Sequence, residues 1–292
     1  MPKRPPIQNL DRLPFPDFSD FSWNKYPHPT EIPIMASRGC VYHCVYCYEC
    51  VFWDKFRCRS AENIVEEMAY RISQHSFQSD SSQNTLFKNR QMHSRPLKFI
   101  FADSLVNGNY RVLGEMCDKI IEQRLNIQWV GQATIDKRMD KSFFQKLKQA
   151  GCVHLGFGLE SGSQKILDIM NKKFQIKDAG PVLRAARISG VKVTLNVMVG
   201  FPSETFLDFI HTIIFLLKNR MWIRSVSNVT STQLALGTPI WLNPEKFGVT
   251  ILPDGSWYSH DTGNETDRKR RLRFLHWAMT CLIIPHQKIA KD

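Results

Sequence analysis

Short runs of β-branched and apolar residues alternate with amphipathic runs between about residues 31 and 236. The apolar runs predict six strands, at 32–37, 97–103, 127–134, 153–160, 191–200 and 226–236. The amphipathic runs predict helices at 60–76, 109–125, 141–150, 163–170, 178–189 and 205–219. Gly151 and Gly190 follow two of these helices, where a C-cap glycine belongs. Strands that alternate with helices predict parallel βαβ units and an α/β fold.

The two faces of the predicted strands differ in polarity. In 153–160, Val153, Leu155, Phe157 and Leu159 alternate with His154, Gly156, Gly158 and Glu160. The strand 191–200 alternates in the same way. Because strand side chains alternate between faces, one face is apolar and the other is polar or glycine. A parallel sheet covered by helices on both faces is apolar throughout. The pattern therefore favours a partial (β/α)6 TIM-like barrel, whose inner face lines a cavity.

Three segments lie outside this alternation of strands and helices. Residues 1–30 are rich in proline and aromatics and predict an extended leader or linker before a barrel core at 31–236. Segment 77–95 is polar and predicts a surface insertion. Residues 237–292 predict an α-rich C-terminal extension with one helix.

The chain has 292 residues, a net charge of +12 and eight cysteines, too few for a disulfide scaffold of this size. It has no apolar segment long enough for a secretory signal or a membrane span, so we expect a cytoplasmic protein. The basic cluster at 268–273 predicts the solvated face of a helix, with polyanion binding as the alternative.

Four cysteines lie between Cys40 and Cys50, and the first three have the spacing C-x3-C-x2-C. Structural zinc needs four ligands, commonly as two separated pairs, and no second pair follows. A C-x2-C redox pair leaves Cys40 without a role. A cubane iron–sulfur cluster can be held by cysteines on a short loop, and three ligands leave one iron open.

Residues that carry chemistry follow the predicted strands. Cys40–Cys47, Asp103, Gln132, Glu160 and 200–205 each come at the end of a different strand. In parallel α/β folds the site forms at the carboxyl ends of the strands, so these residues predict one shared site.

Together with GLESGS at 158–163 and MVGFPSET at 198–205, the C-x3-C-x-aromatic-C motif resembles the radical S-adenosylmethionine (radical SAM) superfamily. The resemblance implies a [4Fe–4S] cluster on Cys40, Cys44 and Cys47, with S-adenosylmethionine chelating the fourth iron. One-electron reduction then gives methionine and a 5′-deoxyadenosyl radical that abstracts hydrogen from a substrate. A fourth protein ligand would close the open iron, so Cys50 is predicted not to bind the cluster.

The resemblance also implies cofactor-binding positions, while catalytic residues stay unassigned. They are Tyr46 and the backbone at Gly200 and Glu204 near the adenine, Asp103 and Ser104 near the methionine amino group, Glu160 and Ser161 at the ribose or methionine carboxylate, and Gln132 and Asn196 facing cofactor or substrate. The usual GGE-like signature is absent at Asp103, which weakens that assignment. Four of these positions have a structural alternative: helix capping for Glu160, dipole compensation for Glu204, a turn for Asp103 and packing for Tyr46.

The residues of these motifs resemble those of the radical SAM branch that often carries an N-terminal cobalamin-binding domain. That branch includes the anaerobic magnesium-protoporphyrin ester cyclase type and radical methyltransferases. Only 39 residues precede Cys40, so cobalamin is not expected to be held by this chain alone. The resemblance implies a small-molecule substrate, a one-electron reductant such as flavodoxin or ferredoxin, and either a separate cobalamin-binding protein or no use of cobalamin.

Two other functions remain open from the sequence. A methylthiotransferase acting on tRNA or protein fits the basic charge, but it needs additional domains that this length does not hold. A non-enzymatic module that binds nucleic acid, built on Cys44, Cys47, Cys50 and Cys58, predicts zinc and salt-dependent polyanion binding.

Overall fold

The computed structural model describes residues 5–22, 25–53, 55–81 and 96–283. Its centre is a sheet of six parallel strands in the order β1-β4-β5-β6-β7-β8. The strands are β1 (Glu31–Ile34), β4 (Leu97–Phe101), β5 (Ile127–Ala133), β6 (Cys152–Glu160), β7 (Lys192–Val199) and β8 (Ser225–Ser231). This open parallel sheet confirms the predicted partial barrel.

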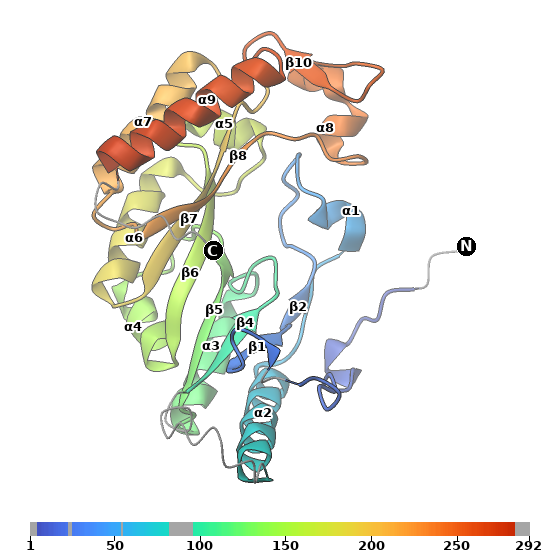
Figure 1. Cartoon of the computed structure of the whole chain (residues 1–292), viewed down its shortest axis with the longest axis vertical. Helices are drawn as coiled ribbons and strands as arrows, with labels where there is room; N and C mark the ends of the chain where they lie inside the picture. The colour runs from blue at the N-terminus through green and yellow to red at the C-terminus, as the bar shows by residue number, and fades with distance from the viewer. Residues whose placement is uncertain (1–4, 23–24, 54, 82–95, 284–292) are drawn as a thin grey trace.

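Helices cover the outer face of the sheet (Figure 1). They are α2 (Ala61–Ser81), α3 (Tyr110–Glu122), α4 (Lys141–Gln149), α5 (Gln164–Ile169), α6 (Ile176–Ile188) and α7 (Phe206–Asn219). Each predicted helix is present, and α2 continues past its predicted end at residue 76 into the proposed insertion. Residues 82–95 of that insertion lie outside the described residues.

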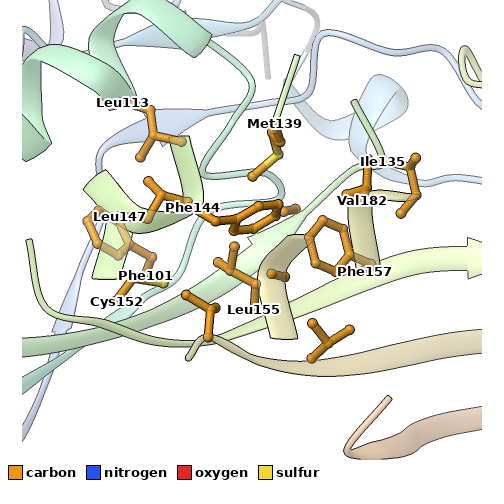
Figure 2. Packing of buried hydrophobic residues seen from close by; sticks show 14 of the residues in the cluster. Phe101, Leu113, Ile135, Met139, Phe144, Leu147, Cys152, Leu155, Phe157 and Val182 are labelled. Carbon is orange, nitrogen blue, oxygen red and sulfur yellow. The ribbon is translucent and has the colours of Figure 1, made fainter. Parts of the chain in front are cut away.

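The alternation along β6 explains how the sheet packs. Figure 2 shows Leu155 and Phe157 of β6 lying against Phe144 and Leu147 of α4, and all four side chains are fully buried. On the opposite face, Gln132 of β5 is exposed, whereas Thr194 of β7 is buried. Apolar side chains at every second position therefore hold the helices, and the opposite face carries polar residues and glycine, as the alternation in the sequence predicts.

The first strand is shorter than predicted. It ends at Ile34, and Ser37–Arg38 form a separate strand, β2, which pairs antiparallel with β3 (Arg57–Cys58). The chain between β2 and β3 contains the cysteine motif and a short helix, α1 (Glu49–Trp53). The two-residue pairing of β2 with β3 joins the two ends of this segment. Because the pairing is antiparallel, the segment leaves the central sheet and returns to it as a loop.

The C-terminal extension contains more than the one predicted helix. It holds α8 (Pro239–Leu242), the 3-10 turn η3 (Pro244–Phe247), a hairpin of β9 (Val249–Ile251) and β10 (Trp257–Ser259), α9 (Glu265–Ala278) and a final π-helical turn, η4 (Met279–Ile283). A further 3-10 turn, η1 (Leu10–Arg12), lies in the leader. The hairpin strands are three residues each, too short to give a sequence pattern.

The basic cluster on α9 is not simply a solvated face. Arg268 is only 3% exposed and Arg271 is half-buried, whereas Lys269, Arg270 and Arg273 are exposed. The prediction is therefore wrong for two of the five cations, because α9 packs against β7 and β8 with these two turned inward. Across the described ranges, no helix combines the length and apolar character that crossing a membrane requires.

Candidate active site

The cysteine motif occupies the loop between β2 and α1. Gly39 opens it with a φ of +83°, and a Cβ there would lie 2.9 Å from the Lys55 carbonyl oxygen, so only glycine fits. The Cys47 N–H donates to the Cys44 carbonyl at 3.0 Å and closes a turn. Cys44 is buried, and Cys40 and Cys47 are half-buried. The loop thus presents three thiols at the end of the first strand.

Two distant segments hold this loop in place. The end of α5 accepts the Val45 N–H at the Met170 carbonyl, 3.1 Å away, and the Asn171 amide donates to the His43 carbonyl at 2.7 Å. From the C-terminal extension, the Ile240 N–H donates to the Val45 carbonyl at 3.0 Å. In Figure 1, α8 accordingly lies beside the loop that leads into α1.

A small hydrophobic cluster accompanies these hydrogen bonds. It consists of Ile166, Met170, Phe201 and Ile240, and we call it the loop-side cluster. Val45 and Tyr46 pack against it, with the Tyr46 and Phe201 rings 6.2 Å apart edge to face. The cysteine loop is therefore packed against segments that follow β6, β7 and β8.

The three sulfur atoms influence one another. Burial raises the pKa of Cys47 to about 11, a hydrogen bond involving the Glu49 backbone opposes that shift, and the charges of Cys44 and Cys40 add to it. A raised pKa keeps the Cys47 thiol protonated until a metal displaces the proton, and three cysteines on one short loop are a donor set that fits an iron–sulfur cluster. Within the described residues, no three Cys, His, Asp or Glu side chains could hold a single metal ion.

Tyr46 and Glu160 meet beside the cysteines, together with Lys172, which the sequence did not single out. The Lys172 ammonium lies 3.2 Å from Glu160 Oε1 and donates to the Gly158 carbonyl at 3.1 Å. It also lies 5.9 Å from the centre of the Tyr46 ring. Burial and the nearby Glu160 carboxylate raise the pKa of Tyr46 well above its usual value.

Lys172 is a nearly buried cation next to the cysteines. Although burial opposes it, the Glu160 carboxylate and the Cys44 thiolate hold the pKa of Lys172 above its usual value, so it is charged. A Cβ at Gly158 would lie 2.7 Å from Glu160 Oε1 and 3.2 Å from the Lys172 nitrogen, so the glycine makes room for the pair. Glu160 itself has a φ of +66°, a strained conformation for a residue with a Cβ.

Asp103 and Ser104 lie at the carboxyl end of β4 but have partners of their own. The Asp103 carboxylate accepts the Ala36 N–H at 3.0 Å and the Ser37 hydroxyl at 2.5 Å. Burial raises its pKa to about 6. Ser104 donates to the Glu49 carboxylate of α1. Both residues thus connect β4 to the two ends of the cysteine loop.

Gln132 and Asn196 lie on the inner face, across β6 from each other. The Asn196 amide donates to Gln132 Oε1 at 3.4 Å, and its oxygen accepts from Ser227 and Asn228 of β8 at 3.2 and 3.3 Å. A Cβ at Gly156 of β6 would lie 2.6 Å from Gln132 Oε1. The inner wall here consists of neutral amide and hydroxyl groups.

The loop after β7 contains Gly200 and Glu204. Glu204 is fully buried, and its Oε2 accepts the Gly200 N–H at 2.7 Å and an Arg271 N–H at 2.8 Å. Burial raises the pKa of Glu204 to about 7. Ser161 is also fully buried, but its hydroxyl accepts the Ser163 N–H at 3.1 Å and lies 3.3 Å from the Thr212 hydroxyl of α7. Its side chain therefore bonds to the α5–α7 region instead of the cysteine loop.

The structure thus brings Tyr46 and Glu160 to the cysteines, joins Gln132 to Asn196, and joins Gly200 to Glu204. Sequence reasoning missed Lys172, Arg271 and Ile240. The NKK run at 171–173 gave no signal, because its neighbours Lys172 and Lys173 look alike in sequence. The Cys50 side chain lies outside the described residues, so its predicted independence from the cluster stays a prediction.

Comparison with known proteins identifies relatives. The family model for the Radical SAM superfamily matches residues 34–216. An anaerobic magnesium-protoporphyrin IX monomethyl ester cyclase of Rubrivivax gelatinosus is 27% identical over 210 residues, which cover 70% of this chain and 34% of that protein. The chain thus spans about a third of that relative's length.

Solved structures show the same fold. The radical S-adenosylmethionine methyltransferase TsrM from Kitasatospora setae, with cobalamin and a [4Fe–4S] cluster bound, superposes with a TM-score of 0.58 at 17% identity. That match covers 76% of this chain and 41% of TsrM. The cobalamin-dependent S-adenosylmethionine radical enzyme OxsB gives a TM-score of 0.61 at 15% identity, over 84% of this chain and 41% of OxsB.

Proposed function

The chain belongs to the radical SAM superfamily, whose members are enzymes that use a [4Fe–4S] cluster and S-adenosylmethionine, and on that premise we propose that Cys40, Cys44 and Cys47 are the cluster ligands. The observation that carries this assignment is the placement of three interacting thiols on one anchored loop at the carboxyl end of β1. Membership of an enzyme superfamily excludes the non-enzymatic zinc module.

When bound, the cluster supplies the electron that cleaves S-adenosylmethionine to methionine and a 5′-deoxyadenosyl radical. The protein's own groups then have to bind and orient this molecule. We assign the methionine carboxylate and ribose side to Glu160 and Lys172, whose paired charges lie beside the cysteines. The Lys172 cation also offsets the negative charge that three thiolates bring to the loop.

The adenosine is assigned to the side of the loop where Tyr46 meets the chain after β7. Tyr46 packs edge to face on Phe201, which follows Gly200 directly. The turn from Gly200 to Glu204 is closed by an internal hydrogen bond, so its backbone has a fixed shape that a flat base can use. Ser161 follows Glu160, but its hydroxyl contacts Ser163 and Thr212, so we assign its side chain no direct contact with S-adenosylmethionine.

Asp103 and Ser104 are assigned a supporting role. Both oxygens of Asp103 hold the chain that enters the cysteine loop, and Ser104 holds the helix that leaves it. We propose that they hold the cysteine loop in position and affect the methionine amino group only indirectly, through that loop.

The substrate would lie over the inner wall formed by Gln132 and Asn196. Neutral amides joined in a network orient hydrogen-bonding groups of a substrate without demanding a charge. With relatives that are ester cyclases and methyltransferases, we propose methyl transfer, cyclisation or a related radical reaction on a small molecule. An external one-electron donor of the flavodoxin or ferredoxin kind would supply the electron that is consumed when S-adenosylmethionine is cleaved.

Anaerobic purification with iron and sulfide analysis tests the proposal, followed by incubation with dithionite and S-adenosylmethionine. We expect about four iron and four sulfide per chain and the formation of 5′-deoxyadenosine. Cys44→Ala should lose both, whereas Cys281→Ala, which changes an exposed cysteine of η4, should keep both. Stoichiometric zinc without sulfide, or 5′-deoxyadenosine from the Cys44→Ala variant, would refute the assignment.

A further inference from the structure

The two inward-facing arginines of α9 both contact the loop that follows β7. One terminal nitrogen of Arg271 donates to the Glu204 carbonyl at 2.7 Å and to Glu204 Oε2 at 2.8 Å. Its other terminal nitrogen donates to the Asp261 carbonyl at 2.8 Å. Arg271 therefore ties the end of this loop to the segment between the β9–β10 hairpin and α9.

Arg268 contacts the beginning of the same loop. It stacks on Trp257 at 3.5 Å from the ring centre and donates to the carbonyls of Trp257 and Gly263. Its side chain fills the space next to Gly200, where a Cβ would lie 2.6 Å from Arg268 Cγ. Gly200 has a φ of +71°, so the close approach and the backbone conformation both require glycine.

The Glu204 carboxylate depends on Arg271. It is fully buried, and Arg271 is the cation that contacts it within the described residues, while Asp208 nearby has the same charge as Glu204. Its Oε1 has no hydrogen-bond partner among the described residues. The bond that closes the turn, from Gly200 N–H to Oε2, is therefore made by a carboxylate whose position the guanidinium fixes.

We propose that Arg271 is a positioning residue for S-adenosylmethionine, acting through Glu204 on the backbone of Gly200–Glu204. The C-terminal extension thereby becomes part of the cofactor site, although Arg271 itself touches no cofactor. This inference rests on the proposed function, which puts the adenosine beside this loop. A displacement of the loop would weaken binding of S-adenosylmethionine more than it changes the rate at saturation.

The test compares Arg271→Ala, Arg271→Lys and Arg273→Ala in the complete chain, reconstituted with iron and sulfide. The quantities are iron content and the KM and kcat for 5′-deoxyadenosine formation as S-adenosylmethionine is varied. Arg271→Ala should raise KM about tenfold with kcat and iron content within about twofold of the unchanged protein. Arg271→Lys should recover part of the loss, because lysine keeps the charge but contacts one group. Arg273→Ala, exposed on the same helix, should change nothing.

A double-mutant cycle with Glu204→Gln shows whether Arg271 acts through Glu204. If it does, Arg271→Ala combined with Glu204→Gln should raise KM no more than the larger single change. The inference would be overturned if the two single increases in KM multiplied in the double variant, or if Arg271→Ala left KM unchanged, with or without a loss of iron. These outcomes would leave the proposed function intact. If the protein without substitutions formed no 5′-deoxyadenosine, the proposed function would be overturned, and this inference with it.

Discussion

At the scale of single residues, the ion pair of Lys172 and Glu160 shows how the site resolves a conflict of charge. The side chains of both are nearly buried, at 12% and 13% exposure, close to the three cysteines that we propose as cluster ligands. A buried pair contributes little net stability, but removing one partner leaves an unpaired charge. The pair is therefore better explained by its position beside the cysteines than by stability alone.

Lys172→Met should destabilise the protein by about 3 kcal/mol, because Glu160 then remains buried without its cation. The free energy of unfolding in urea at pH 7 measures this. Lys173→Met is the matched control, since Lys173 is the exposed neighbour in the same dipeptide. Equal losses in the two variants would show that the burial of Lys172 has no energetic consequence.

The sequence shows the three cysteines but not the residues that hold their loop in place. Cys40, Cys44 and Cys47 are close along the chain, so their spacing alone predicts a shared site. Lys172, Ile240 and Arg271 reach the site only through tertiary contacts, from loops and helices far along the chain. Lys172 and Lys173 are equivalent until the turn after α5 directs one of them inward.

At the scale of elements, the start of α7 connects two helices. Asp208 forms a capping box with Thr205, and its carboxylate also accepts the Ser163 hydroxyl at 2.7 Å and the Lys165 ammonium at 2.9 Å. Ser163 and Lys165 belong to the start of α5, whose far end holds the cysteine loop. One carboxylate thus fixes the helix that carries the anchor Met170.

Asp208→Asn should cost about 2 kcal/mol of unfolding free energy at pH 7, because the capping and charged contacts weaken together. Although burial opposes it, Lys165, Ser163 and Thr205 hold the pKa of Asp208 well below its usual value. A carboxylate whose pKa is lower in the folded than in the unfolded protein stabilises the folded state at pH values above its unfolded pKa. This stabilisation is lost progressively as the pH falls from the unfolded pKa through the folded pKa. The difference between the two proteins should therefore shrink below about pH 4.

Urea unfolding at pH 7 and at pH 3.5 measures that dependence. Asp168→Asn is the control, because Asp168 is exposed and accepts a hydrogen bond from Gln164 within the same helix. A difference that stays constant between the two pH values would mean that the charge of Asp208 is not what stabilises α7.

Regular elements were predictable because their periodicity is local. The predicted strands and helices of 97–219 agree with the structure to within three residues at each end. The ladder of β2 with β3 and the β9–β10 hairpin were not predicted, because two or three residues show no alternation. Their positions depend on what they pair with.

At the scale of the whole molecule, the sheet and the extension differ in how they are held. Strands β5, β6 and β7 each have a neighbour on both sides and a buried outer face. The C-terminal extension packs against the β7–β8 side of the sheet. Its contacts are made by α9, by Arg268 and Arg271 of that helix, and by the loop-side cluster. The most stable part is therefore the centre of the sheet, and the extension is attached to it.

Hydrogen exchange followed by mass spectrometry should separate these parts. Amides of β5–β7 should exchange slowest, since their opening requires the whole sheet to unfold, and amides of α8 to β10 should exchange sooner. The α3 and α4 amides serve as a reference for helices packed on the sheet. One common rate for sheet and extension would show that they unfold as a single unit.

The hydrogen bond from Ile240 to Val45 also has a consequence for biogenesis. A ribosome delivers Cys40–Cys47 long before Ile240, so the nascent loop is for a time without α8 and without one member of the loop-side cluster. In that interval the cysteine loop lacks the hydrogen bond and the side-chain packing that Ile240 supplies. The loop that carries the three cysteines therefore reaches its final position only after residue 240 has left the ribosome, so its geometry is completed late in synthesis.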